Sequence, residues 1–202
     1  MHNVLFATTN QQKVKRLRLL TPVSLGSLAD LPYHIDEPQE SGSDALDIAV
    51  IKARHYFRKL KGKVPVLTQD DTLKMEVNPE DDPGNHIKVP VIAAYGEFSD
   101  ANALMYYTGL TKKYGGVVPM YFEYGHAICF SDGEEVVRAR KSRLVGRIVT
   151  EPRENNTTKG YFLAAIMQVE LDGKWKYYSE LAPAELVRVD SGISESLRRI
   201  LL

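Results

Sequence analysis

Residues 4–13 read Val-Leu-Phe-Ala-Thr-Thr-Asn-Gln-Gln-Lys and combine the signals of a strand, a turn and a helix start. The apolar run predicts a short buried strand, and the hydroxyl and amide side chains after it predict a polar turn. Asn10 is a suitable cap for a helix from Gln11 to about Leu20, with Val14, Leu17 and Leu20 on its inner face. A strand that passes directly into a helix favours an α/β fold.

The rest of the sequence extends this pattern into a mixed sheet. The strongest helix pattern covers residues 43–61, where Ser41 or Ser43 is a suitable cap, and a second short strand is predicted at 64–68. A further helix is predicted from Asp100 to about Tyr114. Beyond it we expect strands at 120–130, 136–148 and 162–171, hairpin turns at Asp132-Gly133 and Asp172-Gly173, and a helix at 193–202. This order predicts an α/β protein with a two-lobed mixed sheet flanked by helices, in which residues 1–202 form a single two-lobed domain.

The composition excludes several classes of protein. The 202 residues carry 26 Lys+Arg and 26 Asp+Glu, so the chain lacks the positive field of a general nucleic-acid binder. The single cysteine, Cys129, excludes an intrachain disulfide and a cysteine-based zinc site, and its apolar neighbours predict a buried strand residue. No stretch has the length and apolarity of a signal peptide or a membrane helix. We therefore expect a cytoplasmic protein that binds neither a nucleic-acid polymer nor a membrane.

The first cluster of polar residues is Thr8-Thr9-Asn10-Gln11-Gln12-Lys13. A strand end followed by a helix N-terminus favours an anion, because free backbone N–H groups and the helix dipole both attract negative charge. The spacing is not that of a glycine-rich phosphate loop. The cluster therefore indicates either a phosphate cradle or simply a capped helix with a solvated lysine.

Two more clusters carry carboxylates. Glu40 to Asp47, followed by Lys52, places acidic residues before and inside a helix start, where they also complement the helix dipole. Asp70-Asp71 follows the predicted strand at 64–68. Hard oxygen ligands of this kind suit Mg²⁺, which typically takes one or two carboxylates together with substrate phosphates. The alternative is an ordinary acidic turn.

Taken in order, these blocks resemble the inosine triphosphate pyrophosphatase family. The matching segments are residues 8–13, 40–53 and 66–73, then Gly146-Arg147-Ile148, Glu151-Pro152-Arg153, Gly160-Tyr161 and residues 180–185. The resemblance implies a two-lobed mixed α/β fold, a homodimer, and an active site in the cleft between the lobes. It also implies an enzyme that uses Mg²⁺ to cleave non-standard purine nucleoside triphosphates into the monophosphate and pyrophosphate.

The same resemblance implies roles for particular residues. Substrate contacts would come from Thr8, Thr9, Asn10, Lys13, Lys52, Gly160 and Tyr161. Catalytic roles would fall to Asp70, Lys52 and Lys13. Glu40, Asp70 and Asp71 would be the metal ligands, with Glu40 or Asp70 alternatively orienting the attacking water.

The sequence departs from the family where the base would be recognised. The family's acidic residue before Asp70 is Gln69, and its aromatic base-contacting segment is Lys159-Gly160-Tyr161-Phe162-Leu163. Its C-terminal Ser-His-Arg has no counterpart. Because a site that pairs with one base edge strongly rejects others, losing these groups predicts altered base selectivity. The alternatives are a catalytically weak or inactive nucleotide-binding homologue with a regulatory role, and a hydrolase for modified pyrimidine nucleotides.

Overall fold

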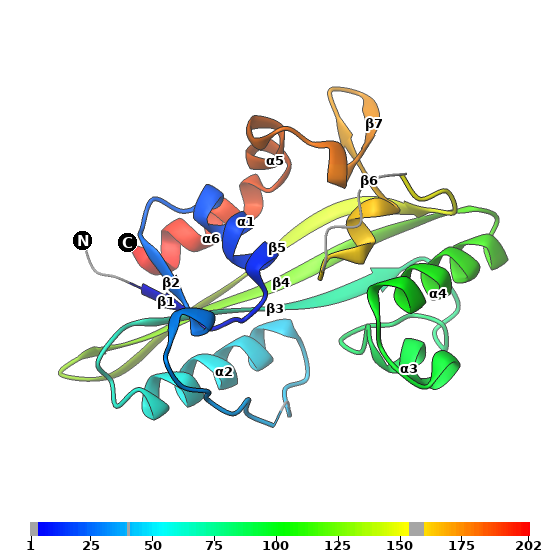
Figure 1. The fold of residues 1–202 in the computed structure, drawn as a ribbon. Helices are drawn as coiled ribbons and strands as arrows, with labels where there is room; N and C mark the ends of the chain where they lie inside the picture. The colour runs from blue at the N-terminus through cyan, green and yellow to red at the C-terminus, as the bar shows by residue number, and fades with distance from the viewer. Residues whose placement is uncertain (1–3, 40, 154–159) are drawn as a thin grey trace. The chain divides into compact units, whose positions relative to one another are not determined.

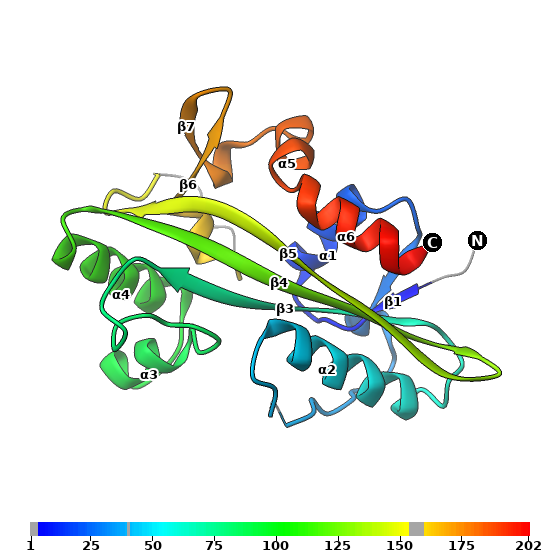
Figure 2. The same cartoon turned by 180° about the vertical axis from the view of Figure 1, so that it is seen from behind.

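The computed structural model describes residues 4–39, 41–153 and 160–202. Within them, one sheet has the strand order β2-β1-β3-β4-β5-β6-β7. The strands are β1 (Val4–Phe6), β2 (Leu25–Ser27), β3 (Val66–Met75), β4 (Val117–Asp132), β5 (Glu134–Val149), β6 (Met167–Leu171) and β7 (Lys174–Tyr177). The α-helices are α1 (Gln11–Leu20), α2 (Ala45–Lys59), α3 (Val89–Tyr95), α4 (Asp100–Lys113), α5 (Pro183–Val189) and α6 (Ser191–Leu201). Figures 1 and 2 show these elements from opposite sides.

The chain divides into two compact units that interleave along the sequence. The first contains residues 1–71, 123–143 and 190–202, and the second contains residues 72–122 and 144–189. The single two-lobed domain predicted for residues 1–202 stays a prediction.

Parallel strands and opposed helices build the first unit. β1 pairs in parallel with both β2 and β3, with Leu5 opposite Val66 and Phe6 opposite Leu67. The path β1–α1–β2 and the return β2–α2–β3 run in opposite directions across the sheet. Since such crossovers are right-handed, the two helices cover opposite faces. In Figures 1 and 2, α1 and α6 lie on one side of these strands and α2 on the other.

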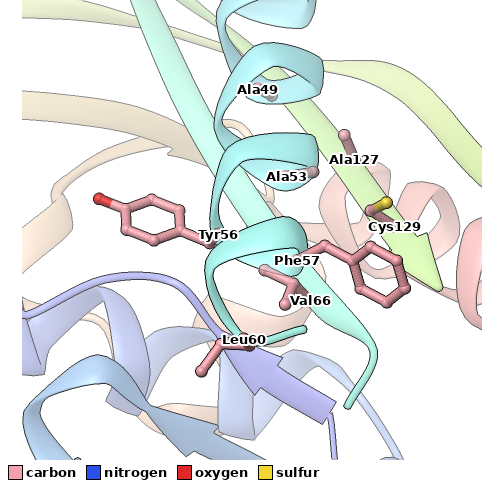
Figure 3. Close-up of a cluster of buried hydrophobic side chains, with 8 residues drawn as sticks. All are labelled: Ala49, Ala53, Tyr56, Phe57, Leu60, Val66, Ala127 and Cys129. Atoms are coloured by element: carbon pink, nitrogen blue, oxygen red, sulfur yellow. The ribbon is translucent and has the colours of Figure 1, made fainter. Parts of the chain in front are cut away.

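The core under α2 explains why this helix has the strongest pattern in the sequence. Ala49, Ala53 and Phe57 are buried against β3 and β4, where they meet Val66, Ala127 and Cys129 (Figure 3). Burial raises the pKa of the Cys129 thiol to about 11, so this residue is an inert part of the core, as predicted. The small side chains let α2 approach closely: a Cβ on Gly125 of β4 would lie 2.2 Å from the Ala45 carbonyl oxygen.

β3 corrects the sequence prediction at the point that matters most for function. The strand was expected at 64–68, with Asp70 and Asp71 after its end and an acidic turn as one alternative for them, but β3 continues to Met75. The polar residues 68–72 are held in extended form by the neighbouring strand β4, which the local sequence does not reveal. Asp70 and Asp71 are therefore strand residues and not a turn.

The second unit contains further differences. Residues 162–165 form a 3₁₀ turn and only 167–171 form β6, because a short apolar run does not distinguish a strand from another buried segment. Two seven-residue helices, α3 and α5, were not predicted. Both predicted hairpin turns are confirmed, one in each unit: Gly133 in the first unit, and Asp172 and Gly173 in the second, have positive φ.

Candidate active site

Asn10 caps α1 through its side chain. Asn10 Oδ1 accepts hydrogen bonds from the backbone N–H groups of Gln12 at 2.9 Å and Lys13 at 3.3 Å. Thr8 supports the turn, because its hydroxyl accepts from Asn10 N at 3.1 Å, and Thr9 is exposed. The predicted cap is confirmed. Asn10 thus satisfies two N–H groups that an anion cradle would have used, and a phosphate-binding role for Thr8, Thr9 and Asn10 stays a prediction.

Lys13, in the first turn of α1, pairs with Asp71. Lys13 Nζ donates to Asp71 Oδ1 at 2.5 Å, and the two side chains are 30% and 21% exposed. The two residues meet because β1 ends at Phe6 while its neighbour β3 continues, which carries Asp71 beside the start of α1. Burial opposes both charges, but their mutual attraction prevails: the pKa of Lys13 is raised and that of Asp71 is lowered.

Lys52, in the middle of α2, pairs with Asp70. Lys52 Nζ donates to Asp70 Oδ2 at 2.5 Å, and both side chains are 17% exposed. Ala49 lies one helical turn before Lys52 in α2, and its carbonyl accepts a hydrogen bond from the Thr68 hydroxyl of β3 at 2.7 Å. This bond fixes the position of α2 along β3. Burial raises the pKa of Asp70 and nearby Asp71 adds to this, although Lys52 lowers it. Asp70 is therefore the more readily protonated of the two adjacent carboxyls.

The two ion pairs lie on opposite faces of β3. Successive strand residues point to opposite sides of a sheet. Asp70 accordingly meets a lysine from α2 and Asp71 a lysine from α1, the two helices that cover opposite faces. The structure thus brings Lys13, Lys52, Asp70 and Asp71 together around one strand, with two positive and two negative charges.

The predicted metal ligands fit Mg²⁺ in their chemistry. Asp70 and Asp71 supply hard carboxylate oxygens, and Mg²⁺ commonly takes only one or two carboxylates and completes its shell with water and phosphate oxygens. No group of three His, Cys, Asp or Glu side chains suited to a metal occurs among residues 4–39, 41–153 and 160–202. Glu40, the third predicted ligand, lies outside the described residues, as does Lys159.

The acidic residues at the start of α2 have structural roles. Asp44 caps the helix by accepting from Leu46 N at 2.8 Å and Asp47 N at 3.0 Å, so the cap is neither Ser41 nor Ser43. Asp44 also accepts from Lys141 at 2.8 Å. These contacts support the alternative stated for the acidic residues of segment 40–47, namely that Asp44 and Asp47 complement the dipole of α2.

A cluster of buried polar residues around Arg16, one turn after Lys13 in α1, was not predicted from the sequence. Arg16 donates through Nε and Nη2 to both carboxylate oxygens of Asp190, at 2.8 and 2.7 Å, and through Nη2 to the Tyr124 hydroxyl at 3.2 Å. His126 Nδ1 lies 3.2 Å from the Ser196 hydroxyl. His126 Nε2 and Gln69 Oε1 are buried without a hydrogen-bond partner among the described residues. The spacing Lys13 to Arg16 placed both cations on one side of α1, a signal that could have marked Arg16.

Gly160 and Tyr161 belong to the second unit. Gly160 N donates to Asp100 Oδ2 at 2.7 Å at the start of α4. The Tyr161 ring packs edge-on against Tyr178, with ring centroids 5.7 Å apart. These contacts hold the Gly-Tyr segment in place, and its role in substrate binding stays a prediction.

A mixed sheet covered by helices, with a lysine–aspartate pair on each face of its strand β3, defines this chain as an α/β protein. The chain belongs to the Ham1 family, whose sequence model matches residues 4–190. This confirms the family resemblance. No match was found among curated proteins.

Solved structures support the fold. A HAM1 protein from Coxiella burnetii has 19% identity and a TM-score of 0.70, over 100% of this chain and 98% of that one. The Ham1 protein of Staphylococcus aureus has 18% identity and a TM-score of 0.66, over 98% and 95%. A nucleoside-triphosphatase / dITP/XTP pyrophosphatase from Mycobacterium abscessus has 25% identity and a TM-score of 0.60, over 98% of both chains. The predicted mixed α/β class is confirmed.

Proposed function

We propose that this chain is a nucleoside triphosphate pyrophosphatase, a hydrolase that cleaves non-standard purine nucleoside triphosphates into the monophosphate and pyrophosphate. Membership of the Ham1 family and the likeness to the M. abscessus dITP/XTP pyrophosphatase support this proposal. The observation that carries the proposal is that two partly buried lysines, Lys13 and Lys52, each form an ion pair with a carboxylate of β3.

The chemistry of these four residues suits the reaction. Cleavage of a phosphoanhydride develops negative charge on phosphate oxygens, and catalysis depends mainly on positioning and on nearby cations. Lys13 and Lys52 would stabilise that charge from the two faces of β3. Asp70, whose pKa is raised by burial, would orient the attacking water and accept its proton.

Magnesium is part of the proposal. Glu40 and one of the two β3 carboxylates, Asp70 or Asp71, would hold the ion, which when bound would neutralise phosphate charge as a Lewis acid. The homodimer and the cytoplasmic location also remain predictions. No helix in the described part of the chain is both long and apolar enough to span a membrane.

Altered base selectivity follows from the residues that differ from the family. Phe162 and Leu163 stand at a polar and a proline position of the family. The family's C-terminal Ser-His-Arg has no counterpart, and the nearest stretch, residues 192–199, belongs to α6. Ser196 is buried against His126, so this residue is unavailable to a base. We expect a broader choice of base than in relatives that keep these groups.

The test measures pyrophosphate release from ITP, XTP, dUTP and the four standard triphosphates, with Mg²⁺ and with EDTA. The proposal predicts Mg²⁺-dependent release with a preference for at least one non-standard nucleotide. A folded protein that binds a triphosphate but releases no pyrophosphate from any of them would support the alternative, a regulatory nucleotide-binding homologue.

A further inference from the structure

Asp71 is an unusual neighbour for a phosphate-binding lysine. Lys13 Nζ donates to Asp71 Oδ1 at 2.5 Å, so the lysine proposed to bind a phosphate already has a carboxylate partner. β3 (Val66–Met75) has two carboxylates, and alternation leaves Asp71 as the one on the α1 face, where Gln69 is neutral. The Lys13 cation is therefore already matched by one anion of the protein.

Several features make this pair hard to separate without compensation. Both side chains are largely buried, so water screens their attraction weakly. Arg16, one turn further along α1, adds positive charge near Asp71, but its guanidinium is bound to both oxygens of Asp190. A triphosphate that displaced Asp71 from Lys13 would leave a partly buried carboxylate beside its own negative oxygens.

We propose that Asp71 acts as an internal competitor for Lys13, and that a divalent cation is required to release it so that triphosphate and cation bind with strong positive coupling. This inference rests on the proposed function and concerns the regulation of the same site. With a cation present, the carboxylate of Asp71 exchanges one positive partner for another and Lys13 is released to the phosphates. The coupling is reciprocal, so triphosphate must strengthen cation binding by the same factor.

The experiment is calorimetric titration of the intact chain with α,β-methylene ITP, which retains three phosphates but cannot be cleaved at the α–β linkage. For wild type we expect affinity at least about tenfold higher in Mg²⁺ than in EDTA. Asp71→Asn removes the competitor's charge, so its affinity in EDTA should rise about tenfold over wild type and its dependence on Mg²⁺ should shrink. The matched control is Asp81→Asn, which removes the same charge from the Lys113 pair of the second unit and should leave both affinities unchanged.

The outcomes separate the inference from the function on which it rests. If wild type binds the analogue in Mg²⁺ but Asp71→Asn gains nothing in EDTA, the internal-competitor role is wrong and the proposed function stands. If folded wild type binds no analogue in either buffer, the proposed function fails first. Asp71→Ser provides the same comparison should Asp71→Asn not fold, with folding checked by circular dichroism.

Discussion

Arg16 donates hydrogen bonds to both carboxylate oxygens of Asp190, at 2.8 and 2.7 Å, and so links α1 to the residue immediately before α6. The Asp190 side chain is fully buried and that of Arg16 is 9% exposed. Since Arg16 lies one turn after Lys13, this contact fixes the helix that carries the candidate phosphate-binding lysine. The Arg16–Asp190 pair is more deeply buried than the Lys13–Asp71 and Lys52–Asp70 pairs of the candidate site.

Asp190→Ala should destabilise the fold severely. Removing one partner of a buried ion pair leaves an uncompensated charge, so we expect a loss of about 3 kcal/mol or more in the free energy of unfolding, measured by urea denaturation. Glu195→Ala is the control on the same helix, because its pair with Arg199 is half exposed. That variant should change stability by less than about 0.5 kcal/mol. Equal effects of the two variants would contradict a special role for the buried pair.

His126 should make stability depend on mildly acidic pH. Burial, helped by the charge of Arg16, lowers the pKa of His126 to about 3. The unfolded chain binds this proton near pH 6.5, so stability is complete above that pH and falls as the pH decreases toward 3. The expected contribution is about 1.4 kcal/mol per pH unit. Urea unfolding at several pH values should show a shallower acid loss for His126→Gln, whereas exposed His34→Gln should follow wild type.

Gly125 should tolerate no side chain. A Cβ would lie 2.2 Å from the Ala45 carbonyl oxygen, so Gly125→Ala forces α2 away from β4 and should cost about 3 kcal/mol. Gly109→Ala, inside α4 with open space around it, should instead stabilise the chain by up to about 1 kcal/mol. Thermal unfolding of the two variants checks the opposite signs. A neutral Gly125→Ala would show that the close approach of helix and strand is not required.

Lys13→Met and Lys52→Met should each reduce pyrophosphate release strongly. Loss of one group that stabilises transition-state charge typically lowers the rate about 100-fold, which we expect in kcat/KM for both variants. Lys15→Met is the matched control, because Lys15 is an exposed residue of the same helix as Lys13. Near-wild-type rates for Lys13→Met or Lys52→Met would remove that lysine from the proposed mechanism.

The sequence predicted elements whose signals are local. α1 lies where its cap and apolar spacing indicated, and the two Asp-Gly turns form hairpins. The extension of β3 was missed because Gln69-Asp70-Asp71-Thr72 has turn-like composition, and only pairing within the sheet makes it a strand. α3 was missed because it has seven residues with Pro90 at its second position, too few for a helical period to emerge.

The candidate site was predictable in its residues but not in its pairing. Family resemblance indicated Lys13, Lys52 and Asp70, yet which carboxylate meets which lysine depends on the alternation along β3 and on the helix that covers each face. Asp190 gave no local signal, because its partner lies 174 residues earlier in the chain. Glu40, and with it the complete set of predicted metal ligands, lies outside the described residues.

The interleaving of the two units has a consequence for biosynthesis. The first unit needs residues 190–202 as well as its first 71 residues, so α1 must await Asp190 for the partner of Arg16. At a translation rate of about 5–20 residues per second, those 174 positions take roughly 9–35 s. Throughout that interval, Arg16 of α1 lacks the Asp190 carboxylate that binds its guanidinium in the folded chain. Ribosome-bound chains should therefore acquire the protease resistance of the first unit late, only after residue 190 has been synthesised.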